Sequence, residues 1–506
     1  MSAPDLNASV RIDALHADLD RRIAALREDP TPVDRSRARV EDALSDGAAH
    51  YGINTGFGAL AQERVPEGDL ETLQRNLVFS HAVGVGDLVP KALSRLILRL
   101  KIHALGLGHS GVSRETFDRL LVFAERDLIP AIPSRGSVGA SGDLAPLAHL
   151  ALPLLGEGRF WTEDGTDVRP AASLLDEHGL EPITLRPKDG LALINGTQQM
   201  SGYGAHVLHE AQRLVKIADL LAAMSLEALQ GSLQPFDERV HEVRPHPGAQ
   251  QVAANVRTLL TDSEILASHR NCGKVQDPYS LRCVPQVHGA SRDALRHATD
   301  VVEREINSVT DNPLVFENGD VISAGNFHGQ PLALALDYAG IALAELAGIA
   351  ERRIYLLLAG HDGLPELLME DTGLNSGYMM PQYTAAALVS ENKSLAHPAS
   401  VDSIPTSRGQ EDHVSMGSVG AVQLLDILEN VERVLAIELL TAAQALDYRR
   451  PLRPGRGVEQ AHETVREAIP HREEDYLFED DIDESLAFVR DEALLASVAE
   501  ELEALG

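Results

Sequence analysis

The chain has few of the residues that give proteins disulfides, thiol chemistry or aromatic surfaces. Only two of its 506 residues are cysteine, and Cys272 and Cys283 fit neither a disulfide framework nor a paired-cysteine metal site. Aromatic residues make up 4% of the chain, and only six of its 44 basic residues are lysine. Residues 1–7 lack the basic and apolar segments of a signal peptide. We therefore expect a reduced protein of the cytoplasm.

Two further absences limit the binding partners. The longest apolar stretch, 331–350, is interrupted by Asp337 and Glu345, so it predicts a buried helix and not a membrane span. The net charge of -32 excludes a general affinity for nucleic acid or anionic membranes, which need a basic surface. An acidic, lysine-poor chain is typical of a halophilic protein, although an acidic mesophile is the alternative.

Hydrophobic residues, mainly alanine and leucine, make up 44% of the chain, and their periodicity is helical over most of its length. We predict a mainly α fold, a bundle of long helices with minor short β-hairpins at 159–168 and 314–323. No linker divides the chain, so we expect one unit, 1–506, softly subdivided at 1–190 and 191–506. The helices are predicted at 10–27, 91–107, 113–126, 196–229, 287–306, 329–358, 414–446 and 472–503.

The most informative loop is 136–146, which contains Ala140, Ser141 and Gly142 just before a helix start. The amide nitrogen of Gly142 can close onto the carbonyl carbon of Ala140, and the ring and Ser141 can each lose water. The product is 4-methylidene-imidazol-5-one (MIO), an electron-poor alkene, and the small residues of the loop permit the required bends. The alternative is an ordinary helix N-cap formed by Ser141 or Asp143.

Four other polar clusters are ambiguous when each is taken alone. Tyr51 begins a glycine-rich loop, 51–58, which lacks the Gly-Lys-Ser/Thr ending of a phosphate-binding loop. His81 has an ordinary structural interpretation, as do Tyr279 and Arg282, which lie one helical turn apart. Arg282 suits a carboxylate ligand but equally a surface ion pair. Glu411 or Asp412 before the last long helix could simply cap it.

Together these clusters occur in a recognisable order along the chain. The order resembles that of the MIO-dependent aromatic amino acid lyases, and within that family it most resembles the histidine ammonia-lyases. The resemblance spans roughly 51–419 and rests on seven motifs, at 51–58, 80–84, 136–148, 195–198, 276–282, 325–328 and 410–413. It implies a nearly all-helical homotetramer whose active sites are shared between subunits. It also implies that MIO forms autocatalytically from residues 140–142, with no external cofactor.

The resemblance also implies an activity and a role for each matched residue. The reaction is the elimination of ammonia from L-histidine to give trans-urocanate, the first step of histidine degradation. Tyr51 matches the base that removes the β-proton, for which its pKa must fall from about 10, and Arg282 or helix N-termini could lower it. The other matched positions are those that hold the MIO oxygen and substrate carboxylate (Asn195, Tyr279, Arg282), line the pocket (Gln276, Phe327) and face the imidazole (His81, Glu411).

Two alternatives stay open at this stage. The chain could be a tyrosine or phenylalanine ammonia-lyase or an aminomutase of the same family, although Ser80, His81 and Glu411 favour histidine. It could also be a catalytically silent helical scaffold. Three positions depart from the family pattern, namely Arg408 and Gly409 in place of Ala-Asn, and Asp189 in place of Glu. We expect no metal, since no HExxH motif occurs and His103, His109 and His149 suit hydrogen-bonded helix histidines.

Overall fold

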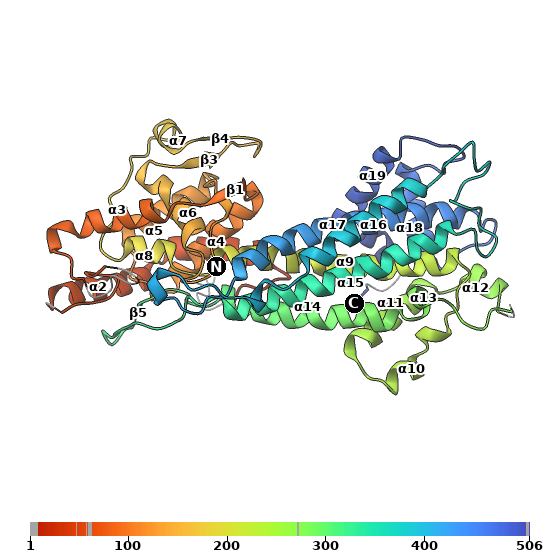
Figure 1. Cartoon of the computed structure of the whole chain (residues 1–506), viewed down its shortest axis with the longest axis horizontal. Coiled ribbons are helices and arrows are strands. Elements are labelled where there is room, and N and C mark those ends of the chain that lie inside the picture. The colour runs from red at the N-terminus through yellow and green to blue at the C-terminus, as the bar shows by residue number, and fades with distance from the viewer. Residues whose placement is uncertain (1–8, 47, 57, 59–62, 271–272, 502–504) are drawn as a thin grey trace. The chain divides into compact units, whose positions relative to one another are not determined.

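The computed structural model describes residues 9–46, 48–56, 58, 63–270, 273–501 and 505–506. Residues 1–7, Cys272 and part of the 51–58 loop, on which sequence predictions were made, lie wholly or partly outside the described residues. Contacts group the chain into two compact units (Figure 1). Unit 1 comprises Met1–His209, Ala298–Asp337 and Pro398–Val422, and unit 2 comprises Glu210–His297, Tyr338–His397 and Gln423–Gly506.

The described chain is mostly helical with short strands, which confirms the predicted fold class. Unit 1 contains the shorter N-terminal helices, α1 (Leu15–Glu28), α2 (Thr31–Ser45), α3 (Leu70–His81), α4 (Lys91–Gly106), α5 (Arg114–Glu125), α6 (Leu144–Ala151), α7 (Ala171–Glu177) and α8 (Asp189–Ile194). Its short 3-10 helices among the described residues are η2 (Glu67–Asp69), η3 (Leu152–Leu155), η5 (Ala399–Val401) and η6 (Ser407–Gly409).

Unit 2 consists of helices and one short 3-10 turn among its described residues. These are η4 (Gln234–Phe236), α10 (Glu238–Glu242), α11 (Pro247–Leu259), α12 (Glu264–Ser268), α13 (Tyr279–Arg282), α16 (Met379–Leu395), α18 (Arg456–Ala468), α19 (Phe478–Arg490) and α20 (Ala493–Glu501). Four long helices contribute residues to both units, α9 (Gln198–Ala228), α14 (Val284–Ile306), α15 (Gln330–Leu358) and α17 (Gly417–Asp447). All four were predicted, with ends within three residues of those observed.

Two helix predictions need correction. The helix expected at 10–27 begins only at Leu15, because residues 10–12 are not helical and their amides bond to side chains elsewhere, Val10 N to Asn307 and Ile12 N to Glu303. The acidic segment 472–503 is not one helix but two, α19 and α20, separated by a break at 491–492. Asp491 adopts an extended backbone there, and its carboxylate accepts a hydrogen bond from Ala493 N.

Both predicted hairpins are present in unit 1. Strand β3 (Arg159–Trp161) pairs antiparallel with β4 (Val168–Pro170), and β5 (Leu314–Val315) pairs with β6 (Val321–Ile322). A third pair was not predicted, β1 (Val85–Leu88) with β2 (Pro133–Arg135), because its strands are more than forty residues apart. This pair leads directly into the 136–146 loop.

Helix α15 has the length and apolar composition of a membrane-crossing helix, although 61% of its most apolar window is buried inside the structure. A buried core helix of a soluble protein can have the same length and apolar composition, and a buried helix was the prediction for 331–350.

The packing of unit 1 fixes the elements on either side of the 136–146 loop. Helix α6 packs against α3 and α8, and α4 packs against α1 and α5. Leu147, Leu150, Leu193 and Ile194 are fully buried where α6 and α8 form this core. Burying such side chains stabilises the fold by about 1.5–3 kcal/mol each. The ends of α6 and α8 therefore have little freedom to move, and the loops attached to them carry the candidate site.

Candidate active site

The 140–142 tripeptide lies in a loop whose backbone only glycine can complete. Gly139 and Gly142 have φ of 69° and 73°, in the left-handed region that favours glycine. Gly142 forms a parallel bridge with Gly196, and a Cβ atom on Gly142 would lie 2.0 Å from the carbonyl oxygen of Gly196. The close approach of the two backbones therefore requires glycine at position 142.

Ser141 is contacted by a functional side chain on each side. Its hydroxyl donates a hydrogen bond to Glu411 Oε1 at 3.1 Å, and its carbonyl oxygen accepts one from Asn195 Nδ2 at 2.8 Å. Residues separated by more than fifty positions in the sequence thus converge on the central residue of the tripeptide. Sequence order alone did not predict these contacts.

Asp143 stands at the N-cap position of α6, but its side chain makes no cap hydrogen bond to that helix. The carboxylate instead accepts from Met200 N at 2.9 Å, in the first turn of α9, and from Ser418 Oγ at 2.6 Å. The predicted cap of α6 is therefore wrong, because the Asp143 carboxylate bonds to the first turn of α9 instead. Burial raises the pKa of Asp143 to about 6, although Ser418 and the α9 amides favour the ionised form.

Residues at the start of α17 that were not predicted from the sequence form hydrogen bonds to the tripeptide loop. Met416 N donates to Val138 O at 3.0 Å, and Ser415 Oγ donates to Gly139 O at 3.3 Å. Ser418 Oγ also lies 2.9 Å from Ser137 Oγ. The serines that directly follow the 410–413 motif were the available signal.

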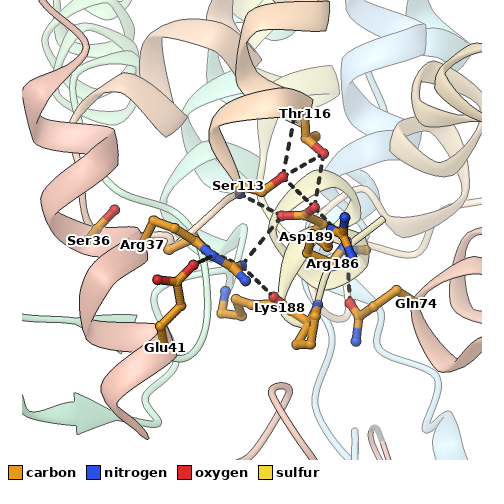
Figure 2. Close-up of polar contacts among 12 residues, drawn as sticks. Ser36, Arg37, Glu41, Gln74, Ser113, Thr116, Arg186, Lys188 and Asp189 are labelled. Carbon is orange, nitrogen blue, oxygen red and sulfur yellow. Dashed lines mark hydrogen bonds and ion pairs between the residues drawn. The ribbon is translucent and has the colours of Figure 1, made fainter. Parts of the chain in front are cut away.

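Asn195 follows α8 directly, and a buried carboxylate fixes the start of that helix. Figure 2 shows Asp189 facing Ser113 and Thr116 of α5. Its two oxygens accept hydrogen bonds from Ser113 N (2.6 Å), Ser113 Oγ (2.7 Å), Thr116 Oγ1 (2.9 Å) and Arg186 N (2.8 Å). Aspartate thus reaches these four donors at a position where the resemblance would lead us to expect the longer glutamate.

A buried lysine, also missed, lies behind Asn195. Lys101 Nζ donates to Asn195 O at 2.8 Å and to Gln198 Oε1 at 3.4 Å. Burial lowers the pKa of Lys101 to about 7. Nearby Lys188 contributes to this lowering, while the charges of Asp311 and Asp143 oppose it. A lysine directly between the apolar residues Leu100 and Ile102 of α4 was the signal that could have identified it.

Tyr51 and His81 both interact electrostatically with Glu411. Burial raises the pKa of Tyr51, and the Glu411 charge raises it further, although Gly58 N donates to the phenol oxygen at 3.2 Å. Burial lowers the pKa of His81, opposed by Leu77 O and Glu411. His81 Nδ1 lies 2.8 Å from Leu77 O, which can only accept, so the neutral ring carries its proton on Nδ1 and presents Nε2 as an acceptor.

Glu411 does not cap α17, contrary to the structural alternative for this residue. Its Oε2 accepts from Thr406 Oγ1 at 2.6 Å, while Oε1 faces Ser141. Phe327 is half-buried in the turn before α15. The next residue, His328, stacks on His413 with ring centroids 6.0 Å apart and donates to His413 O from Nε2 at 3.1 Å. This contact ties the Phe327 turn to the Glu411 loop.

Gln276, Tyr279 and Arg282 belong to unit 2. Tyr279 and Arg282 lie one turn apart on α13, as predicted, with Arg282 Cζ 4.7 Å from the centre of the Tyr279 ring. The Tyr279 side chain is 70% exposed, and Gln276 is exposed beside it in the chain. Asp277 anchors this segment by accepting a hydrogen bond from Ser232 N at 2.7 Å.

The predicted residues therefore form two groups, one in unit 1 and a second in unit 2 that consists of Gln276, Tyr279 and Arg282. Ser141, Asn195 and Glu411 are in direct contact in unit 1, and Tyr51 and His81 interact electrostatically with Glu411. Asn195 Oδ1 is buried with no hydrogen-bond partner among the described residues, an acceptor available to a ligand. His103, His109 and His149, expected to be structural, each have a hydrogen-bond partner: Arg22, Val315 O and Gly84 N.

Comparisons with known proteins show the family to which the chain belongs. A family model described as aromatic amino acid lyase matches residues 12–467. A histidine ammonia-lyase from Anaeromyxobacter sp. strain K is 54% identical over 89% of this chain and 91% of that protein. The crystal structure of histidine ammonia-lyase from Trypanosoma cruzi is 43% identical, with a TM-score of 0.86 over 93% of this chain and 89% of that one. A tyrosine aminomutase from Streptomyces globisporus is 36% identical, with a TM-score of 0.89 over 98% and 99% of the two chains. The chain belongs to the aromatic amino acid lyase family.

Proposed function

We propose that the protein is a histidine ammonia-lyase, which eliminates ammonia from L-histidine and releases trans-urocanate. The observation that carries the proposal is the position of the Glu411 carboxylate, 3.1 Å from Ser141 Oγ and within electrostatic reach of His81. A carboxylate and a neutral His81 acceptor together suit the two N–H groups of an imidazolium, and the carboxylate alone suits the single N–H of a neutral imidazole. A phenyl ring has no group that would use either acceptor.

The residues around the tripeptide fit MIO as its cofactor. Asn195 Nδ2 already donates to the Ser141 carbonyl oxygen, which becomes the ring oxygen when the tripeptide cyclises. Gly142 provides the unhindered nitrogen, and a side chain there would collide with Gly196. Once formed, MIO supplies an electrophilic alkene that activates the substrate for loss of ammonia.

The remaining steps are assigned to side chains of the protein. Asn195 holds the ring oxygen and offers its free Oδ1 to the substrate, while Glu411 and His81 orient the imidazole. Tyr51 removes the β-proton, for which its pKa must fall. Within unit 1, burial and the Glu411 charge raise the pKa instead, so we assign the lowering to a cation of another subunit. Arg282 is the residue that we assign to this role and to the substrate carboxylate.

We further propose that the active protein is a homotetramer in which another subunit completes each site with Gln276, Tyr279 and Arg282. An apolar surface of unit 2 supports self-association. Tyr338, Ile341 and Tyr355 are exposed along one stripe of α15, and Met380 and Tyr383 are exposed on α16. Gln382 Nε2 joins the two helices by donating to Glu351 Oε1 at 2.7 Å. Sedimentation velocity would give a tetramer, and a stable monomer with full activity would contradict this assembly.

Purified protein incubated separately with L-histidine, L-tyrosine and L-phenylalanine tests the proposal. We expect urocanate and ammonia from histidine, and no activity in Ser141→Ala, which cannot lose the hydroxyl. Coumarate or cinnamate as the main product would contradict the assignment. A β-amino acid product would instead favour the aminomutase reaction named for the S. globisporus relative. An inactive, unmodified chain would support the silent scaffold.

That the protein is cytoplasmic is a further proposal, supported by its two cysteines, which fit no disulfide framework. The salt dependence of the same assay tests another proposal, that the protein is halophilic. The net charge of -32 supports it, since a dense negative surface is better screened at high ionic strength. We expect activity and tetramer stability to rise with KCl concentration. Full activity and stability in dilute buffer would overturn the halophilic proposal and leave the acidic mesophile.

A further inference from the structure

We infer that Thr406 is a positioning residue for substrate specificity, since it holds the Glu411 carboxylate in the orientation that recognises imidazole. This inference rests on the proposed function and extends it to a residue outside the matched motifs. Thr406 Oγ1 donates to Glu411 Oε2 at 2.6 Å, the usual length of a charge-assisted hydrogen bond from a hydroxyl to a carboxylate, which is stronger than a neutral one. Glu411 itself is only partly buried, so packing alone does not fix its side chain.

The turn between the two residues makes this contact rigid. Thr406 and Glu411 form an antiparallel bridge, in which Thr406 N donates to Glu411 O at 3.0 Å, and Gly409 N donates to Thr406 O at 2.9 Å. Ser407, Arg408 and Gly409 all have positive φ, at 49°, 55° and 85°. A non-glycine residue in this region is strained, so the surrounding hydrogen bonds must hold the turn in place.

The two carboxylate oxygens have different partners, and this divides their roles. Oε2 is bound by Thr406, while Oε1 accepts from the Ser141 hydroxyl. Maturation of the tripeptide removes that hydroxyl, after which Oε1 has lost its donor and is available to an imidazole N–H. The Thr406 bond remains, so the freed oxygen stays directed at the tripeptide and does not rotate toward solvent.

Three substitutions separate this role from a general effect on the loop. Thr406→Val keeps the shape and removes the donor, while Thr406→Ser restores a hydroxyl. Ser403→Ala is the matched control, because Ser403 Oγ accepts a loop hydrogen bond from Val414 N at 2.9 Å without contacting Glu411. Each is assayed for kcat and KM with L-histidine, and its 140–142 peptide is weighed by mass spectrometry. A cycle with Glu411→Gln measures whether the two residues act as a unit.

For Thr406→Val we expect kcat/KM to fall roughly 10- to 100-fold, mainly through KM, because a hydrogen bond to a charged group that orients the substrate is lost. Thr406→Ser should recover most of the lost kcat/KM, and Ser403→Ala should have a kcat/KM close to that of the wild type. In every variant the 140–142 peptide should still be lighter than its sequence by two waters. In the Glu411→Gln background the Thr406 change should add little. Any of four results overturns the inference: wild-type kinetics in Thr406→Val, no rescue by serine, fully additive losses, or an unmodified peptide. A wild-type enzyme inactive on histidine refutes the proposed function itself.

Discussion

Each unit buries a cluster of charged side chains, and the clusters differ in what their cations bind. In unit 2, Arg353 donates to both oxygens of Glu438 at 2.5 and 2.9 Å, and Ser225 adds a bond of 2.8 Å. Nearby, Asp219 accepts from His288, Arg292 and Asn255 at 2.6 to 2.9 Å. Unit 1 also buries an ion pair, since Lys188 donates to Asp311 at 2.7 Å, but Lys101, beside the tripeptide, donates to neutral oxygens of Asn195 and Gln198.

The pKa directions of Asp219, Asp143 and Lys101 follow the same division. Burial alone would raise the pKa of Asp219, but Arg292 and His288 lower it below its usual range. For the two groups beside the tripeptide burial prevails, raising the pKa of Asp143 to about 6 and lowering that of Lys101 to about 7. Burial also raises the pKa of Glu227 in unit 2, to about 7, so the difference lies between these clusters and not between the whole units. The unit 2 cluster therefore contributes to the stability of the fold. Unit 1 instead places ionisable groups with shifted pKa values, and the unpaired acceptor Asn195 Oδ1, next to the tripeptide.

The largest effect is expected from breaking the unit 2 pair. Arg353→Met leaves Glu438 as a buried charge without its counterion and should reduce the free energy of unfolding by about 3–5 kcal/mol. Urea denaturation measures the loss. Arg433→Ala, whose partner Glu429 is exposed, is the control and should cost at most about 1 kcal/mol. Equal costs for the two arginines would remove the distinction between the clusters.

The corresponding change in unit 1 should affect catalysis and hardly affect stability. Asn195→Leu removes the donor to the Ser141 carbonyl oxygen, and kcat should fall about 10²- to 10³-fold, as when one donor to a developing oxyanion is lost. The free energy of unfolding should change by only about 1 kcal/mol. Steady-state kinetics and urea denaturation on one preparation give both values. A large loss of stability with little loss of kcat would reverse the assignment.

The pH dependence of stability tests the buried carboxyl of Asp143. Its pKa is raised to about 6 in the folded protein, so the folded state binds more protons than the unfolded state between about pH 4 and 6. The stabilisation is complete below pH 4 and is lost as pH rises toward 6, a change of about 3 kcal/mol. The wild type should therefore lose stability relative to Asp143→Asn over this range. A parallel pH dependence of the two proteins would show that Asp143 has an ordinary pKa.

The comparison also shows what the sequence could predict. Helical periodicity identified the long helices, and the motif order identified Ser141, Asn195 and Glu411, because those signals are local. Whether Asp143 caps α6 or α9 depends on a contact with Met200, which no local pattern contains. Lys101, Ser415 and Thr406 were missed for the same reason, since their importance lies in what they touch after folding. The assignment of Gln276, Tyr279 and Arg282 to the site stays a prediction.

The smallest expected effect concerns the strained turn beside Glu411. Arg408 has a φ of 55°, which costs a non-glycine residue about 1–2 kcal/mol. Arg408→Gly should therefore increase the free energy of unfolding by about 0.5–1 kcal/mol, part of the relief being offset by a more flexible unfolded chain. Arg408→Ala keeps the Cβ atom and is the control, with no gain expected. If alanine stabilises as much as glycine, removal of the arginine side chain and not backbone strain is responsible.

The mass of the peptide that contains Ala140, Ser141 and Gly142 tests the central claim most directly. We predict that this peptide, taken from active protein, is lighter than its sequence by two waters. The same peptide from Ser141→Ala should not have lost both waters, and that variant should produce no urocanate. An unmodified peptide in a preparation that still converts L-histidine to urocanate would contradict the account.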